Sequence, residues 1–292
     1  ASDKDIYISH CLFGNINNAI HCGQNSVLQS FTIENANGFG INGGGYFSDL
    51  FITGNNGYGI QTVNNVAQYF DCIVENNSGN GIYGGGYFSD IIASNNTGYG
   101  IRSNNSVSVF QNCVIDSNGS YGINRGGTFL NVDVTNNGGY GIETANDTAS
   151  YINVHIENNE SFGITGGQHF ETVTVMNNGA HGITSNTLAE FHNCLIEEND
   201  EYGVNGGVLF DSSFVRYNGE YGIFTSNNQA EYHGCDVSGN NGYGISGGKI
   251  VSECTISDNN GFGIILTAPV EANIENSTIS GNENSVSSNT EG

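Results

Sequence analysis

The sequence predicts an all-β parallel solenoid, in which each repeat forms one coil of short strands. An aromatic residue, a Gly and an aliphatic residue recur together along the chain, as in Tyr121-Gly122-Ile123. The aliphatic anchors lie at alternating intervals of 19 and 21 or 22 residues, which is the self-similarity of a repeat protein. Gly accounts for 44 residues and Pro for one, which indicates many tight turns in an ordered chain. The anchors are Ile20, Ile41, Ile60, Ile82, Ile101, Ile123, Ile142, Ile164, Ile183, Val204, Ile223, Ile245 and Ile264.

Each coil is expected to turn hydrophobic side chains inward from more than one strand. The residues eight and ten positions before the anchor, such as Ile115 and Cys113, are mostly aliphatic or Cys, and their period of two predicts one strand face. The residue thirteen positions before the anchor is aromatic, as at Phe110. The odd spacing between these positions requires a bend, which we place at residues such as Asn112. We expect about 13–14 coils in a single domain over residues 1–292, with the last few residues as a tail.

Two further columns repeat in almost every coil. The residue five positions before the anchor is Asn in all but one coil, and we expect a ladder in which neighbouring Asn amides bond to one another. Because Asn tolerates the left-handed backbone region, we assign that conformation to the same residue. The Gly just before the anchor, as at Gly122, is expected to need positive φ or a close backbone approach.

The stretch Phe110–Ile123, which carries these positions in one coil, resembles repeats of the right-handed parallel β-helix family. That family includes pectate lyases, polygalacturonases, alginate epimerases and phage tailspikes. The resemblance covers essentially the whole chain and implies a right-handed coil. It implies no particular activity, because one fold hosts many functions.

Composition excludes several classes of partner. Five basic residues stand against 29 acidic ones, for a formal net charge of −24, so a nucleic-acid partner is not expected. No apolar run approaches about 20 residues, and we expect no membrane insertion. Most of the seven Cys fall on the inward file, Cys11 is expected to join them, and we predict free thiols. We expect no cofactor, while a divalent cation stays an open alternative.

Candidate catalytic residues lie on outward positions of the expected strands. Asp116, Asp133, His155 and Glu157 fall within about three coils, and carboxylates beside a His are suited to acid–base work. Asp116, Asp133 and Glu157 are also the candidate cation ligands. The alternative is a solvated acidic face. The local signatures of alginate epimerases and polygalacturonases are absent, and only Arg216 lies on the same face to neutralise a uronate, which together disfavour an enzyme.

Other outward positions suggest contacts with partners. An apolar stripe predicts a lateral interface, unless a loop covers it; it consists of Phe51, Ile73, Ile92 and Val114. A column of Tyr and Phe two positions before the anchor is expected to be half-exposed, and either stabilises a turn or stacks on sugar rings. Asn104 and Asn146 are sequons in the expected projecting loops and are the candidate glycosylation sites.

These observations favour a non-enzymatic extracellular or cell-surface structural protein. Since no capping helix is visible in the sequence, we expect end-to-end self-association into a filament, or else an adhesin or surface stalk. The alternative function is a polysaccharide-binding module or a polysaccharide lyase or epimerase-like enzyme, with glycans as partners.

Overall fold

The computed structural model describes Lys4, residues 6–266 and residues 272–288. The chain divides into two compact units, Ala1–Asn146 (unit 1) and Asp147–Gly292 (unit 2), which are described separately. Each unit is a stack of parallel β-strands, which confirms the predicted all-β parallel solenoid. In the part of the chain that the structure describes, no helix is long and apolar enough to cross a membrane. The prediction of a single domain over residues 1–292 stays a prediction.

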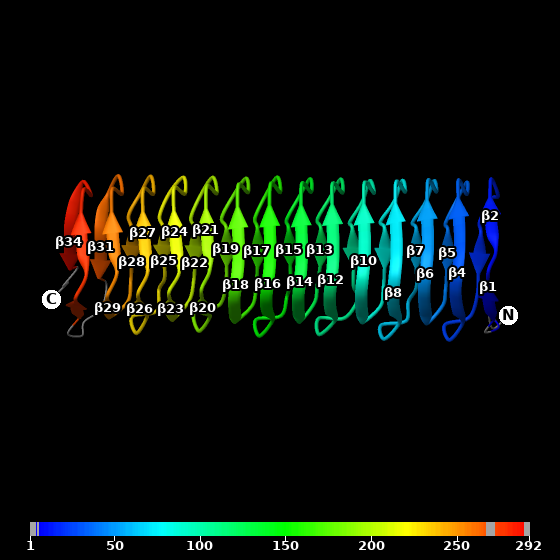
Figure 1. The fold of residues 1–292 in the computed structure, drawn as a ribbon, viewed down its shortest axis with the longest axis horizontal. Coiled ribbons are helices and arrows are strands. Elements are labelled where there is room, and N and C mark those ends of the chain that lie inside the picture. Colours follow the sequence, from blue (N-terminus) through cyan, green and yellow to red (C-terminus); the bar gives the residue numbers. More distant parts are fainter. Residues whose placement is uncertain (1–3, 5, 267–271, 289–292) are drawn as a thin grey trace. The chain divides into compact units, whose positions relative to one another are not determined.

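In unit 1, each coil after the first gives one long strand to a first sheet and one short strand to a second sheet (Figure 1), while the first coil gives the first sheet two short strands, β1 (Tyr7–Ser9) and β2 (Leu12–Gly14). The first sheet contains β1 (Tyr7–Ser9), β2 (Leu12–Gly14), β4 (Val27–Glu34), β6 (Tyr46–Thr53), β8 (Gln68–Glu75), β10 (Tyr87–Ser94), β12 (Val109–Asp116) and β14 (Thr128–Thr135). The second contains β3 (Ile20–His21), β5 (Ile41–Asn42), β7 (Ile60–Gln61), β9 (Ile82–Tyr83), β11 (Ile101–Arg102), β13 (Ile123–Asn124) and β15 (Ile142–Glu143).

Unit 2 begins with the same plan, and its later coils divide the long strand in two. The first sheet contains β16 (Ser150–Glu157) and β18 (His169–Met176), followed by the pairs β20 (Glu190–His192) and β21 (Leu195–Glu197), β23 (Leu209–Asp211) and β24 (Phe214–Arg216), β26 (Glu231–His233) and β27 (Asp236–Ser238), β29 (Ile250–Ser252) and β30 (Thr255–Ser257), and β32 (Asn273–Glu275) and β33 (Thr278–Ser280). The second contains β17 (Ile164–Thr165), β19 (Ile183–Thr184), β22 (Val204–Asn205), β25 (Ile223–Phe224), β28 (Ile245–Ser246), β31 (Phe262–Leu266) and β34 (Asn284–Ser288).

A bend divides each long strand into a first arm and a second arm. The residue eleven positions before the anchor has positive φ, for example 53° at Asn112 and 52° at Asp49, which confirms the predicted bend. A second positive-φ residue follows the second arm, at 56° in Ser117. The left-handed position is therefore one residue before the ladder Asn, here Asn118, and its assignment to the ladder Asn was wrong. The ladder Asn is instead fixed by its own hydrogen bonds.

In three of the divided coils, a side chain accepts a hydrogen bond from the backbone at the point where the strand divides. The amide of Cys194 donates to Ser213 Oγ at 3.1 Å, and the amide of Cys254 donates to Ser277 Oγ at 3.1 Å. The amide of Cys235 likewise meets Cys254 Sγ at 3.4 Å. A bond from the backbone to a side chain replaces a rung of the ladder, and the two arms become separate three-residue strands.

The core of each coil contains one aromatic ring, stacked on the ring of the next coil. In unit 1, Phe88 and Phe110 have ring centroids 4.7 Å apart, and in unit 2 Phe170 and Phe191 are 4.6 Å apart. These four side chains have no exposed surface. The predicted inward aromatic file is thus confirmed, and burial of each such ring stabilises the fold by roughly 1.5–3 kcal/mol.

The predicted Asn ladder is also confirmed. Asn118 Nδ2 donates to Asn137 Oδ1 at 3.0 Å, and Asn96 Nδ2 donates to Asn118 Oδ1 at 3.0 Å. Both backbone amides make parallel bonds to the same oxygens. Gly122, just before the anchor, is required by close approach, because a Cβ there would lie 2.2 Å from Val134 Cγ1.

All seven Cys are free thiols, as predicted, and six of them are buried. Burial raises the pKa of the Cys72 and Cys113 thiols to about 12, so these residues act as small apolar side chains. The expectation that Cys11 joins the inward file agrees with the register, because Leu12 lies opposite Thr32 and Cys11 therefore lies opposite the inward residue Phe31. Cys11 is nevertheless exposed, because it belongs to the first coil, where β2 pairs with β4 alone among the described strands.

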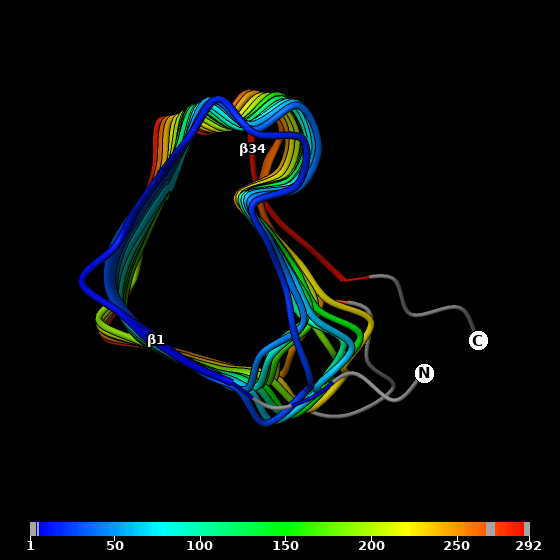
Figure 2. The ribbon, with the colours of Figure 1, turned by 90° about the vertical axis from the view of Figure 1, so that its right-hand side faces the viewer.

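The loops that precede every second long strand project beyond their neighbours. In unit 1 these loops precede β4, β8 and β12, and they extend from one corner of a coil path that is otherwise shared (Figure 2). Asn amides tie them together across two coils: Asn64 donates to Gln24 O at 2.9 Å, and Asn146 donates to Ser106 O at 3.0 Å. The long and short coils expected from the spacing therefore differ at this corner.

Candidate functional site

Asp116 and Asp133 lie on the second arm in unit 1. Asp133 is exposed and is in register with Val114, whereas Asp116 is in register with Thr135. The Asp116 carboxylate accepts hydrogen bonds from Thr135 Oγ1, Asn136 Nδ2 and Ser117 Oγ at 2.7, 2.7 and 2.8 Å. Partial burial raises the pKa of Asp116, but these three bonds outweigh burial and hold its pKa below the ordinary value. The Asp116 carboxylate is thus already occupied by three hydrogen bonds from neighbouring side chains.

His155 and Glu157 lie on β16 in unit 2. His155 Nε2 and Glu157 Oε2 are 3.1 Å apart, and about a third of each side chain is exposed. The structure therefore brings these two predicted residues together. The predicted catalytic roles of Asp116, Asp133, His155 and Glu157, and the predicted cation site, stay predictions.

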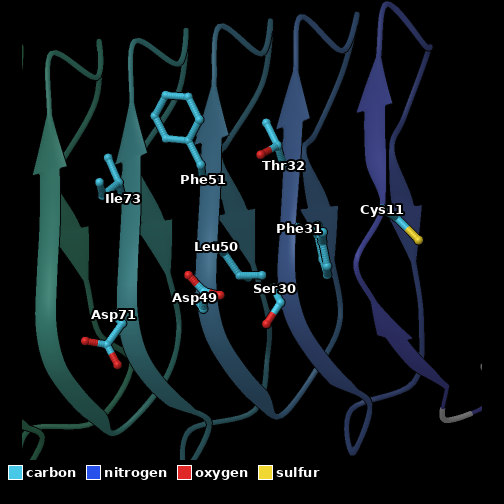
Figure 3. A pocket seen from close by; sticks show the side chains of 9 residues that line it. All are labelled: Cys11, Ser30, Phe31, Thr32, Asp49, Leu50, Phe51, Asp71 and Ile73. Carbon is cyan, nitrogen blue, oxygen red and sulfur yellow. The ribbon is translucent and has the colours of Figure 1, made fainter.

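The predicted apolar stripe lies on the second arm in unit 1 and is uncovered within the described residues. Phe51, Ile73, Ile92 and Val114 follow one another in register on β6, β8, β10 and β12. Their exposed fractions lie between 36% and 40%. Phe51 and Ile73 line a depression of about 360 Å³, together with Asp49 and Asp71 on the same two strands, β6 and β8 (Figure 3). The role of this stripe as a lateral interface stays a prediction.

The two sequon residues lie in the projecting loops, as expected. Asn104 is half-buried, and its carbonyl accepts a bond of 3.4 Å from Arg125 Nη1. The Nδ2 atom of Asn146 is the atom that a glycan would occupy, and it already donates to Ser106 O. A glycan attached to Asn146 Nδ2 would leave this nitrogen with one hydrogen, which could still donate to Ser106 O. Glycosylation at Asn104 and Asn146 stays a prediction.

A pocket that the sequence reasoning missed lies on the second sheet of unit 1. We call it the aromatic–arginine pocket; it has a volume of about 330 Å³ and is lined by Tyr99, Arg102, Tyr121, Asn124, Arg125, Glu143 and Ala145. The strands β11, β13 and β15 place Arg102, Asn124 and Glu143 at the same register position in three successive coils. The half-buried aromatic column two positions before each anchor supplies the Tyr rings.

The polar side chains of this pocket are held by specific partners. The Arg102 guanidinium lies 5.4 Å from the centroid of the Tyr99 ring and 5.6 Å from that of Tyr83, within cation–π range. Asn124 Nδ2 donates to the Glu143 carboxylate. The Tyr99 and Tyr121 rings meet edge to face at 5.2 Å. Arg102 is thus held against aromatic rings beside a carboxylate, and the exposed Arg125 also lines the pocket.

Arg125 occupies a backbone position that glycine fills elsewhere. It lies two residues after its anchor and has a φ of 70°, and its amide donates to Glu143 O at 2.6 Å. The same position in five other short coils is Gly43, Gly84, Gly166, Gly206 and Gly247, with φ between 85° and 121°. The sequence signal was the triplet Asn124-Arg125-Gly126, which interrupts this series of glycines. The candidate residues predicted from the sequence all lie on strands or in projecting loops, so this turn position was not among them.

The Tyr121 phenol is kept protonated by its surroundings. Burial raises its pKa above the ordinary value, and the charges of Glu143 and the neighbouring Tyr140 and Tyr99 raise it further. The Tyr121 ring stacks on Tyr140 with centroids 4.6 Å apart. Tyr121 therefore presents a fixed aromatic wall and a hydroxyl donor.

Several solved structures are similar to this chain. The A-module of the mannuronan C-5 epimerase AlgE4 of Azotobacter vinelandii matches with a TM-score of 0.51 and 10% sequence identity, over 99% of this chain and 91% of that chain. The AlgE6 A-module of the same organism gives a TM-score of 0.47, 16% identity and coverages of 97% and 89%. The periplasmic alginate epimerase AlgG gives a TM-score of 0.45, 14% identity and coverages of 89% and 74%.

No protein-family model matches the chain, and no curated protein matches its sequence. The similarity to the AlgE4 module, at 10% identity, concerns the fold alone. This chain has the right-handed parallel β-helix fold, as the resemblance of its repeats implied.

Proposed function

We propose that this protein binds an acidic polysaccharide and that the aromatic–arginine pocket holds one uronate unit of it. Arg102 and Arg125 are two of only five basic residues in the chain. Guanidinium groups bind carboxylates through charge-assisted, often bidentate hydrogen bonds, and Arg is favoured over Lys for this purpose. A volume of about 330 Å³ lies within the range of small-ligand pockets.

The observation that carries the proposal is the backbone conformation of Arg125. A residue other than Gly in the left-handed region costs roughly 1–2 kcal/mol. Five other short coils avoid this cost with Gly at the same position. Strained residues cluster at ligand sites, where the surrounding structure holds them. A ligand that needs a cation at this point would account for Arg in place of the Gly found in the other short coils.

The Tyr rings supply the second element of sugar recognition. Tyr99 and Tyr121 are half-buried and so present part of each ring to the pocket. Aromatic rings combine a large apolar surface with a polar hydroxyl, which suits the apolar faces and hydroxyl groups of a pyranose. Asn124 and Glu143 add hydrogen-bonding groups for ring hydroxyls.

The net charge of −24 opposes binding of an anionic polymer, but distance limits this repulsion. At about 0.15 M salt the Debye length is about 8 Å, so remote carboxylates are screened while groups in contact are not. The local balance of charge among Arg102, Arg125 and Glu143 therefore determines the affinity of the pocket for a uronate.

Among the hypotheses from the sequence, this proposal develops the polysaccharide alternative. The AlgE4 A-module, which has the same fold, is by its name an epimerase of mannuronan, a polyuronate. The filament and stalk hypotheses, with end-to-end self-association, stay predictions. The proposal keeps the predicted extracellular or cell-surface location, where the protein would meet its polysaccharide.

An epimerase or lyase is the second candidate, since the pocket combines the groups that such reactions need. Both reactions begin with removal of the proton on the carbon next to the carboxylate. Arg102 and Arg125 would neutralise that carboxylate, Glu143 is the nearby proton acceptor and Tyr121 is the protonated donor. Epimerisation inverts that carbon, whereas elimination leaves an unsaturated sugar.

Titration calorimetry with short oligouronates tests the proposal. The wild-type chain is expected to bind oligomannuronate or oligogalacturonate and not a neutral oligomannose of equal length. Arg102→Gln and Arg125→Gln each remove one charged hydrogen-bond partner, worth about 1.5–3 kcal/mol, and should weaken binding by about 10- to 100-fold. Product analysis of the same mixtures distinguishes an epimerised or unsaturated product from unchanged sugar.

The matched control is Lys249→Gln, which removes a positive charge in unit 2 and should leave the affinity unchanged. Circular dichroism of each variant establishes that the fold is intact. Equal binding of neutral and acidic oligomers, or wild-type affinity in the Arg102→Gln and Arg125→Gln double variant, would refute the proposal.

A further inference from the structure

The first arm in unit 2 carries a set of His and acidic side chains that lies outside all the sites described above. These residues face outward on four consecutive strands and alternate with buried rings such as Phe191 and Phe210. We call them the histidine–acid face; they are His169 and Glu171 on β18, Glu190 and His192 on β20, Asp211 on β23, and Glu231 and His233 on β26.

Parallel register brings these residues together from different coils. His169 lies opposite Glu190, and Glu171 lies opposite His192, on adjacent strands. His192 in turn lies opposite Asp211. Neighbouring strands are about 4.8 Å apart, so side chains at equal register can reach the same point in space. The His169 and His192 ring centroids are 6.0 Å apart.

Among the described residues, His169, Glu190 and His192 form one group whose ligand atoms all lie within 4.8 Å of one another. In a tetrahedral site with bonds of about 2.0–2.1 Å, ligand atoms are roughly 3.4 Å apart. Because these side chains are half-buried or exposed, small rotations can bring their ligand atoms from within 4.8 Å to the roughly 3.4 Å separation of a tetrahedral site. Their present contacts do not hold them firmly, because His192 Nε2 is 3.9 Å from Glu190 Oε2.

We propose that His169, Glu190 and His192 form a binding site for a divalent transition metal ion, with Zn²⁺ as the best match. Two imidazoles and one carboxylate are a ligand set that zinc accepts, and imidazole disfavours Ca²⁺ and Mg²⁺. Three protein ligands on an outward face leave a coordination position open to water, as in catalytic and not structural zinc sites.

Neighbouring carboxylates are placed to orient the imidazoles. Asp211 Oδ2 is 3.6 Å from His192 Nδ1, so a small rotation would let it accept that N–H and leave Nε2 of the same ring for the metal. A carboxylate that accepts the second ring N–H fixes the tautomer and raises the basicity of the ligand. Glu171 Oε2 lies 3.6 Å from His169 Nε2 and adds negative charge to the site.

His233 belongs to the same face but is engaged elsewhere. Its Nδ1 is 2.7 Å from Ser252 Oγ, and its Nε2 is 3.2 Å from Glu231 Oε2. Both ring nitrogens therefore have close partners. This arrangement makes His233 a matched control for the two proposed ligands.

Calorimetric titration of the full, tag-free and chelator-treated chain with ZnCl₂ tests the site. We expect one saturable Zn²⁺ site per chain, with CaCl₂ giving no comparable binding. His169→Ala and His192→Ala should each weaken Zn²⁺ binding by more than about 100-fold, since even an outer partner contributes about 10- to 100-fold. Asp211→Asn should weaken Zn²⁺ binding by the smaller factor of about 10- to 100-fold, and His233→Ala should bind Zn²⁺ as tightly as the wild type does.

A second measurement separates coordination from general electrostatic attraction. Co²⁺ bound by His169, Glu190 and His192 should show the intense visible absorption of a four-coordinate ion, and His192→Ala should abolish it. All these side chains face outward, so circular dichroism should be unchanged in every variant. The proposal fails if Zn²⁺ does not saturate a site, if Ca²⁺ binds equally well, or if the two His variants keep wild-type affinity.

Discussion

At the scale of single residues, the exceptions to the repeat indicate where chemistry is held. Arg125 interrupts a column of positive-φ glycines and lies in the aromatic–arginine pocket. His169 and His192 likewise occupy outward positions that vary from coil to coil. A repeated residue satisfies the same structural need in every coil, whereas an exception at the same position requires its own reason.

Arg125→Gly should stabilise the protein while it weakens oligouronate binding. Removal of the left-handed strain gains roughly 1–2 kcal/mol, and the added freedom of Gly in the unfolded chain returns roughly 0.5–1 kcal/mol. We therefore expect a net gain of about 1 kcal/mol in the free energy of unfolding, measured by urea denaturation.

The control for this prediction is Arg102→Gly. Arg102 lies in strand β11 with no left-handed strain, so Gly there should destabilise the protein by roughly 0.5–1 kcal/mol. A loss of stability in both variants would show that the conformation of Arg125 is not strained.

At the scale of elements, the solenoid is defined by columns that cross the coils. The columns that were predicted correctly are those in which one residue type fills nearly every coil, such as the inward rings and the ladder Asn. The left-handed residue was misplaced by one position because Asn occurs at both places, as Asn76 and Asn77 show. Periodicity alone cannot separate two adjacent Asn that have different backbone roles.

The candidate sites were harder to predict for the same reason. Outward side chains are free to vary, so a pattern search over the second arm found His155 and Glu157 but missed the first arm altogether. His169 and Glu190 are 21 residues apart in the sequence and become neighbours only through the register of β18 and β20. The spacing of the anchors gives this register, and applying it to every outward position would have exposed the cluster.

Asn118→Ala should destabilise unit 1 strongly, because Asn118 links three coils. The substitution removes the acceptor of the Asn96 amide and the donor to Ala93 O, which lies at 3.0 Å. Each buried group left without a partner costs about 1–3 kcal/mol, so we expect a loss of about 2–5 kcal/mol in urea denaturation. The neighbouring exposed Thr97→Ala is the control and should change stability by less than about 0.5 kcal/mol. Equal midpoints for the two variants would contradict a stabilising role for the ladder.

At the scale of the whole molecule, regular and irregular positions have different tasks. The regular positions build the β-helical coils of both units, and they account for most of the sequence similarity between repeats. The irregular positions hold the aromatic–arginine pocket in unit 1 and the histidine–acid face in unit 2. Both sites concentrate ligand-binding groups on outward surfaces, while the core is built mainly from apolar side chains.

The charge of the chain should make its stability depend on salt. With 29 acidic and five basic residues, repulsion among surface carboxylates opposes the folded state, in which they are closest together. Raising NaCl from about 0.01 M to about 1 M shortens the Debye length from about 30 Å to about 3 Å and screens this repulsion. The melting temperature measured by circular dichroism should therefore rise with NaCl.

Sorbitol at equal osmolality is the control for non-ionic effects, and NaCl avoids the specific binding that a divalent salt would add. A melting temperature that does not rise with NaCl, or that rises equally with sorbitol, would mean that attractive pairs such as Arg216 with Glu197, at 2.8 Å, outweigh the excess negative charge.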